Sequence, residues 1–257
     1  MLPLKDKWIV VTRPKHQAEN LRLQLEAAGA RVLLFPLQEI KQPDNILMVK
    51  KQLSKIIDYD LAIFISPNAV EYTLKSIDSN ILGALKVAAI GKKTKALLEA
   101  KEIAVDFYPK AIANSEAFLA MPELLTFCKE KKIVILRGNG GRDLIRDTLR
   151  EASNSVDYIE VYKRDRPYQN LNILSEHYYR NELDIILISS VNGLEHLFQT
   201  VSENGWLSEV TLLLGSKRIK EQAFALKEHL GELFFTQDPS DEAVYMQLLE
   251  WAKMDNQ

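Results

Sequence analysis

The chain has 257 residues, of which 47% are hydrophobic and 26% charged, and its formal net charge at pH 7 is −2. This balance is typical of a globular protein with one large or two ordinary domains, and it argues against a general nucleic-acid binder or a membrane-surface protein. The single cysteine, Cys128, excludes an internal disulfide and indicates a reducing compartment. No signal-peptide pattern or membrane-length apolar run is present, so we expect a cytoplasmic protein, and we expect a monomer.

The first half of the chain alternates between short apolar runs and segments with helical spacing. The runs at 8–12 and 32–35 flank a helical pattern that Gly29 ends, so they predict a β-α-β unit with parallel strands. A polar segment with two prolines, 36–45, is typical of a linker or an edge strand. Further strands are expected at 61–68 (with its turn), 87–90 and 105–108, and further helices at 47–57, after 68, from 91 to about 100, and at 116–125.

The second half repeats this pattern. Strands are expected at 133–136, 156–161, 184–188, 210–214 and 233–235, and helices at 142–152, 171–179, up to 197, after 215 to near Gly231, and at 241–252 behind a Ser240 cap. Ser66 corresponds to Ser190 (190 − 66 = 124) and Gly91 to Gly215 (215 − 91 = 124). This self-similarity predicts an α/β fold with two similar, small, doubly wound (flavodoxin-like) parallel-sheet domains.

Two arrangements of the halves remain open. Each half can form a contiguous domain, or the first β-α-β unit of each half can join the remainder of the other half. The second arrangement makes the chain cross between domains near 36–43 and 160–167. Both segments are polar, contain proline and lie in repeat register, so the sequence permits the crossing.

Polar and basic residues follow most of the expected strands, where ligands bind in parallel α/β sheets. Each such turn precedes a helix, and helix N-termini carry unpaired N–H groups and partial positive charge that attract anions. The pattern therefore predicts a site for a ligand with many acidic groups. The candidate substrate-binding residues are Thr12, Arg13, Ser66, Asn68, Gly91, Thr94, Arg137, Gly138, Ser189, Ser190, Gly215 and Lys217.

The turn that starts at Gly138 keeps a second hypothesis open. Its glycines begin like a dinucleotide-binding fingerprint, although Asp143 replaces the third glycine, and Glu160 follows 22 residues after Gly138. The alternative is a non-enzymatic two-domain module that binds nucleotides or other anions. No side chain stands out as a nucleophile, and the four histidines lack metal-ligand spacing, so no metal site is expected.

The order of short motifs resembles the uroporphyrinogen-III synthase family over nearly the whole chain. The motifs are Thr12-Arg13-Pro14, Phe64-Ile65-Ser66-Pro67-Asn68-Ala69-Val70, Ile90-Gly91-Lys92-Lys93-Thr94, Val161-Tyr162, Ser189-Ser190 with Asn192-Gly193-Leu194, and Pro239-Ser240. The resemblance implies a cofactor-free enzyme that cyclises hydroxymethylbilane, a linear tetrapyrrole with eight carboxylates, to uroporphyrinogen III with inversion of ring D and loss of water. It implies the crossed arrangement, with domains at 1–35 plus 168–257 and at 44–160, and linkers at about 36–43 and 161–167 that form a two-stranded ladder.

The resemblance also assigns roles. Tyr162 is the candidate acid that helps the hydroxyl leave, and a phenol with a pKa of about 10 is a weak acid, so its contribution should be modest. Thr94 matches a family position with a hydroxyl near the cleft. The second half departs from the family at the corresponding position, where Arg218 stands instead of a hydroxyl.

Overall fold

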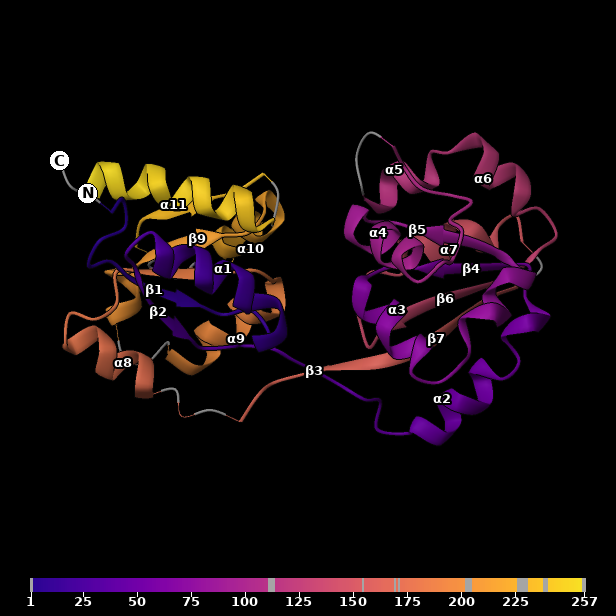
Figure 1. Ribbon diagram of the computed structural model, residues 1–257, viewed down its shortest axis with the longest axis horizontal. Coiled ribbons are helices and arrows are strands. Elements are labelled where there is room, and N and C mark those ends of the chain that lie inside the picture. Colours follow the sequence, from indigo (N-terminus) through magenta and orange to yellow (C-terminus); the bar gives the residue numbers. More distant parts are fainter. Residues whose placement is uncertain are drawn as a thin grey trace. The chain divides into compact units, whose positions relative to one another are not determined.

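The computed structural model describes residues 2–110, 114–153, 155–168, 170, 172–201, 205–225, 231–237 and 240–255. The chain divides into two compact units, one made of Met1–Glu39 with Asp165–Gln257 and the other of Ile40–Arg164. They are called unit 1 and unit 2 below. Each unit holds one five-stranded sheet with helices on both of its faces (Figure 1).

The sheet of unit 1 has the order β10-β9-β8-β1-β2, and its paired strands are parallel. The strands are β1 (Trp8–Val11), β2 (Arg31–Leu34), β8 (Ile185–Ile188), β9 (Thr211–Leu214) and β10 (Leu233–Phe235). The helices are α1 (Lys15–Ala27), α8 (Asn172–Tyr179), α9 (Val191–Val201), η3 (Trp206–Ser208), α10 (Lys217–Ala225) and α11 (Asp241–Asp255). Ile9 and Val11 pack with α1 and α11, whereas Val10 packs with α8, α9 and α10, because successive strand residues face opposite sides.

The sheet of unit 2 has the order β3-β7-β6-β4-β5. The strands are β3 (Glu39–Lys41), β4 (Leu61–Phe64), β5 (Lys86–Ala89), β6 (Lys132–Gly138) and β7 (Ser155–Asp165). The helices are α2 (Ile46–Leu53), η1 (Ile56–Asp58), α3 (Pro67–Leu74), η2 (Ser79–Ala84), α4 (Lys92–Ala100), α5 (Ser115–Leu119), α6 (Pro122–Phe127) and α7 (Leu144–Arg150). Ala62 and Phe64 pack with α2, α3 and α4, and Leu61 and Ile63 pack with α5, α6 and α7.

The internal repeat explains why the two sheets have related strand orders. Leu61 begins β4 and Ile185 begins β8, which are 124 positions apart (185 − 61 = 124). In unit 1, β1 of the first half pairs with β8 of the second half. In unit 2, β6 of the second half pairs with β4 of the first half. The predicted fold class, two α/β parallel-sheet domains, is confirmed.

Several predicted elements differ in detail from the structure. The helix expected at 116–125 is two short helices, because Pro122 lacks an N–H and begins α6 instead of continuing α5. The strand expected at 105–108 is a single bridge between Phe107 and Ala88. The helix expected at 47–57 ends at Leu53 and is followed by the 3-10 turn η1. Leu171, residues 226–230 before Gly231, and Pro239 lie outside the described residues.

Within the described ranges, no helix is long and apolar enough to cross a membrane. Cys128 is fully buried in unit 2, in the cluster on the α5–α7 face of the sheet, as expected for a core cysteine.

Candidate functional site

The end of β1 in unit 1 is tied to two other elements. Thr12 Oγ1 donates a hydrogen bond to the carbonyl oxygen of Leu187 at 2.6 Å. Arg13 Nε donates to Ser189 Oγ at 3.0 Å, and its Nη1 forms an ion pair with Asp241 in the first turn of α11. Both Thr12 and Arg13 are buried, with exposed fractions of 5% and 6%. Arg13 therefore joins the ends of β1 and β8 to the start of α11.

The other predicted residues of unit 1 lie at helix starts. The backbone N–H of Gly193 donates to Ser190 Oγ at 3.0 Å, so Ser190 caps the first turn of α9. The N–H of Gly215, just after β9, donates to the carbonyl oxygen of Ile188 at 2.8 Å. Lys217 begins α10 and is exposed, and its Nζ lies 3.9 Å from Glu221. Such an exposed pair contributes little to stability.

In unit 2, two predicted turns also cap helices. Ser66 is the N-cap of α3, and its Oγ accepts a hydrogen bond from the N–H of Ala69 at 3.1 Å. Asn68 lies half-buried in the first turn of α3. Gly91 is the N-cap of α4, and Thr94 is buried in the first turn of that helix, with 1% of its surface exposed. The burial of Thr94 places its hydroxyl inside the unit rather than on its surface.

Arg137 at the end of β6 is held by the turn that follows it. Its side chain is 4% exposed and donates hydrogen bonds to the carbonyl oxygens of Gly138, at 3.2 Å, and of Gly140. It also pairs with Asp143 at 3.2 Å and lies over the ring of Tyr158, with 4.4 Å from the guanidinium carbon to the ring centroid. The glycines of this turn therefore wrap the side chain of Arg137.

Asp143 and Tyr158 stabilise each other's charge state beside this arginine. The Tyr158 hydroxyl donates to the Asp143 carboxylate at 3.0 Å, and this bond, with Arg146 and Arg137 nearby, lowers the pKa of Asp143. Burial and the same hydrogen bond raise the pKa of Tyr158. Asp143 is therefore a carboxylate at neutral pH, and it accepts hydrogen bonds from Arg137 and Tyr158. The turn that begins at Gly138 thus binds the side chain of Arg137. This contact removes the main support for the hypothesis that the turn binds a nucleotide.

Tyr162 owes its position to an irregularity in β7. Arg137 pairs with Glu160 but Gly138 pairs with Tyr162, so β7 has one extra residue at this point, as in a β-bulge. Val161 and Tyr162 are consequently both buried, although they are adjacent in the strand. A Cβ on Gly138 would lie 2.3 Å from the Tyr162 ring, so only glycine leaves room for it. The bulge and the glycine together place the phenol inside unit 2.

The Tyr162 hydroxyl joins a hydrogen-bonded network at the ends of β4, β6 and β7. Its oxygen lies 3.1 Å from Ser66 Oγ and 2.9 Å from Arg164 Nη2. Arg164 is fixed by Asn139, whose Oδ1 accepts from the Arg164 backbone N–H at 2.6 Å and whose carbonyl oxygen accepts from Nη1 at 3.0 Å. Sequence reasoning missed Arg164 and Asn139. The signal available was the two-residue spacing from Tyr162 to Arg164, which often places side chains on one face of a strand.

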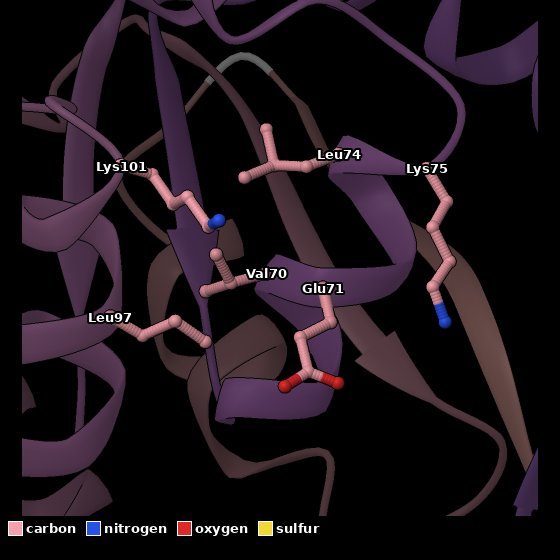
Figure 2. Close-up of a pocket in the computed structure, with 6 residues that line it drawn as sticks. All are labelled: Val70, Glu71, Leu74, Lys75, Leu97 and Lys101. Atoms are coloured by element: carbon pink, nitrogen blue, oxygen red, sulfur yellow. The ribbon is translucent and has the colours of Figure 1, made fainter.

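A separate pocket of about 290 Å³ lies between α3 and α4 of unit 2. Figure 2 shows its six lining side chains, and the apolar ones come from both helices. The lining residues are Val70, Glu71, Leu74, Lys75, Leu97 and Lys101. None of the predicted substrate-binding residues lines this pocket, so the predicted site at the strand ends is distinct from it.

Comparisons with known proteins agree with one another. A family model described as uroporphyrinogen-III synthase HemD matches residues 19–230. The uroporphyrinogen-III synthase of Escherichia coli (strain K12) is 28% identical over 84% of this chain and 89% of its own length. That of Proteus mirabilis is 31% identical over 61% of this chain and 79% of its own. A crystal structure of a mutant uroporphyrinogen III synthase from Thermus thermophilus has a TM-score of 0.65 at 16% identity and covers 96% of this chain and 98% of that one. The crystal structure of the Helicobacter pylori 26695 enzyme has a TM-score of 0.61 at 17% identity, with coverage of 95% and 99%.

Proposed function

Because the chain belongs to the uroporphyrinogen-III synthase family, we propose that it binds the carboxylates of its linear tetrapyrrole substrate at the strand ends of its two sheets. The chain is an enzyme of tetrapyrrole biosynthesis and performs the cyclisation step: hydroxymethylbilane closes to uroporphyrinogen III, ring D is inverted and water is lost. The match of the family model to residues 19–230 carries this assignment.

The contacts at the strand ends separate two kinds of residue. Backbone N–H groups at the starts of α3, α4, α9 and α10 lie where helices attract anions, and these helices begin near Ser66, Gly91, Ser190 and Lys217. Arg13 and Arg137 are instead buried and bonded to the protein. We assign direct carboxylate binding to the helix starts and to exposed Lys217. Arg13 and Arg137 hold the turns in shape, and Gly138 leaves room for Tyr162.

The chemistry requires control over where a reactive intermediate is attacked. Loss of the terminal hydroxyl leaves a cationic azafulvene, and attack by the substituted carbon of ring D gives a spiro intermediate that fragments and recloses. Simple head-to-tail closure competes with this route. Several carboxylate contacts that fix the folded chain of pyrroles supply the orientation that favours the inverted product.

The test is to incubate the protein with hydroxymethylbilane, oxidise the product and separate the porphyrin isomers. The type III isomer should predominate. Predominance of the type I isomer, which forms spontaneously, would show that this chain does not catalyse the family reaction. A second measurement concerns salt: KM should rise between low and moderate ionic strength, because screening weakens the attraction between a polyanion and helix starts or lysines. A KM independent of salt would contradict the electrostatic assignment.

A further inference from the structure

The burial of Tyr162 conflicts with a direct role as an acid toward substrate. The side chain is fully enclosed, with 1% of its surface exposed, and its ring belongs to the core cluster with Phe64 and Val161. Ser66, which lies 3.1 Å from the phenol oxygen, is only half-buried. The hydroxyl that a substrate can reach is therefore that of Ser66.

The direction of each hydrogen bond in this network follows from what each group can donate. The Arg164 guanidinium has only donors, so the phenol oxygen of Tyr162 accepts from it. Among the contacts of the described residues, Ser66 Oγ is then the acceptor within reach of the phenol hydrogen. A buried hydroxyl hydrogen rarely stays without an acceptor, so Tyr162 donates to Ser66.

Ser66 is thereby left with one hydrogen to give. Its oxygen accepts from the N–H of Ala69 at 3.1 Å and from Tyr162, which occupies its two lone pairs. Its own hydroxyl hydrogen is directed away from these two partners. The network thus runs in one direction, from Arg164 through Tyr162 to Ser66, and ends in a donor at the carboxyl end of β4.

Building on the proposed function, we propose that Ser66 is the catalytic donor to the leaving hydroxyl of the substrate, with Tyr162 and Arg164 as positioning residues behind it. Ser66 Oγ gives its proton to the hydroxyl oxygen, the carbon–oxygen bond breaks with both electrons moving to that oxygen, and water leaves. The pyrrole nitrogen lone pair forms the new double bond of the azafulvene. Ser66 takes the proton of Tyr162, and the phenolate that remains faces the guanidinium of Arg164.

The proton returns when the ring system closes. In the final closure the unsubstituted α-carbon of ring D attacks the methylene carbon of the azafulvene left by fragmentation. That ring carbon then loses its proton as the pyrrole becomes aromatic again, and the proton passes through Ser66 to the Tyr162 phenolate. Each turnover therefore starts and ends with a neutral phenol, and the overall reaction releases only water. Asn139 keeps Arg164 in place through three hydrogen bonds, so the charge that stabilises the phenolate is fixed before the reaction begins.

The experiment compares kcat, KM and isomer ratio for Ser66→Ala, Tyr162→Phe, Arg164→Gln and the double variant Ser66→Ala with Tyr162→Phe. We expect kcat to fall at least tenfold in each single variant with KM changed little, since the donor acts in the transition state. The double variant should be no slower than Ser66→Ala alone, because the residues act as one unit. Ser66→Thr, which keeps a hydroxyl, should recover most of the lost kcat.

Asn45→Ala is the matched control for the helix cap. Asn45 caps α2, an eight-residue helix of the same unit and length as α3, through a 3.0 Å bond from the N–H of Met48. It should leave kcat unchanged although it removes a cap. Tyr162→Phe keeps the aromatic ring in the core, so it reports on the network even if Ser66→Ala folds poorly. Type I product from the unmodified protein would overturn the proposed function itself. If the unmodified protein forms the type III product, two results would overturn only the proposed role of Ser66, Tyr162 and Arg164. One is an unchanged kcat in Tyr162→Phe, and the other is a double variant whose loss of kcat is the product of the two single losses.

Discussion

Arg13 in unit 1 and Arg137 in unit 2 occupy the same position of the internal repeat, 124 residues apart (137 − 13 = 124), yet they are bound in different ways. Arg13 lies just after β1 and Arg137 lies near the end of β6, and both are buried, with exposed fractions of 6% and 3%. Arg13 pairs with Asp241, which is 228 residues away in the sequence. Arg137 bonds to residues one to six positions away, within its own turn.

The difference teaches that the repeat conserves the position of a buried cation but not its partner. A guanidinium taken out of water must be paired and hydrogen-bonded, and each unit meets this requirement with what lies nearby. In unit 1 the start of α11 supplies the carboxylate. In unit 2 a glycine-containing turn folds its carbonyl oxygens around the side chain. Unit 2 thereby brings Gly138 and Asn139 next to Tyr162 and Arg164, and the network around Ser66 has a place to form.

The chain offers separate reporters for the two units. All three tryptophans, Trp8, Trp206 and Trp251, belong to unit 1, so tryptophan fluorescence follows its unfolding. The single cysteine, Cys128, is buried in unit 2, so the rate at which a thiol reagent modifies it follows the opening of that unit.

The largest effect is expected for Arg137→Met. The change leaves the carbonyl oxygens of the turn and Tyr158 without the cation around which they are arranged, and breaking a buried, paired charge destabilises a protein by about 3 kcal/mol. The rate of Cys128 modification under native conditions should rise by about 100-fold, which corresponds to that free energy at 25 °C. The tryptophan transition should stay where it is. An unchanged modification rate would show that the turn holds its shape without Arg137.

Arg13→Met should have a smaller effect, and it should destabilise unit 1 instead of unit 2. Its partner Asp241 keeps 27% of its side chain exposed and can be hydrated when the arginine is lost. We therefore expect unit 1 to lose about 2 kcal/mol, somewhat less than the usual cost of breaking a fully buried pair. The urea midpoint followed by tryptophan fluorescence should fall while Cys128 modification stays slow. Equal responses of both reporters to either variant would contradict the assignment of each arginine to one unit.

Gly138→Ala sharpens the comparison further, because it perturbs the Ser66 network and leaves Arg137 in place. The new methyl group would meet the Tyr162 ring at 2.3 Å, and overpacking of this kind costs about 1 to 3 kcal/mol. Cys128 should become more reactive, and kcat should fall because the phenol is displaced from Ser66. Gly83→Ala is the control, since a Cβ there meets nothing within 4 Å. The interpretation fails if both substitutions change the modification rate equally.

The sequence predicted the inner strands of the sheets well, because these are short apolar runs buried on both faces. Residues Ile185 to Ile188 are all fully buried, and their pattern was visible without a structure. The split at Pro122 and the extension of β7 to Asp165 were not predicted. The ends of helices and strands depend on competition between neighbouring segments and on pairing with other strands. The residues of the candidate site were proposed from their type and position, and their contacts were not predicted. Arg13 and Asp241 meet only through the tertiary fold, and a bulge that reorients Tyr162 leaves no pattern in the sequence.

The smallest effect concerns alkaline pH and again separates the units. Burial raises the pKa of the Cys128 thiol to about 11, and burial together with Asp157 raises the pKa of Tyr59 to about 12. A group whose pKa is higher in the folded state stabilises the fold below its unfolded pKa and loses this contribution as the pH rises to the folded value. Unfolded thiols and phenols titrate near about 8.5 and 10, so unit 2 should lose stability progressively between about pH 8.5 and 12. In unit 1 the corresponding raised group among the described residues is the half-buried phenol of Tyr178, hydrogen-bonded to Glu209, against the Cys128 thiol and the Tyr59 phenol in unit 2. Urea titrations across this pH range can follow unit 1 by tryptophan fluorescence and unit 2 by the part of the far-UV circular dichroism change that does not coincide with the fluorescence change. The urea midpoint of unit 2 should fall more than that of unit 1. Cys128→Ala should reduce the difference, since it removes the thiol, and a parallel fall of both midpoints would mean that these buried groups do not set the alkaline limit of unit 2.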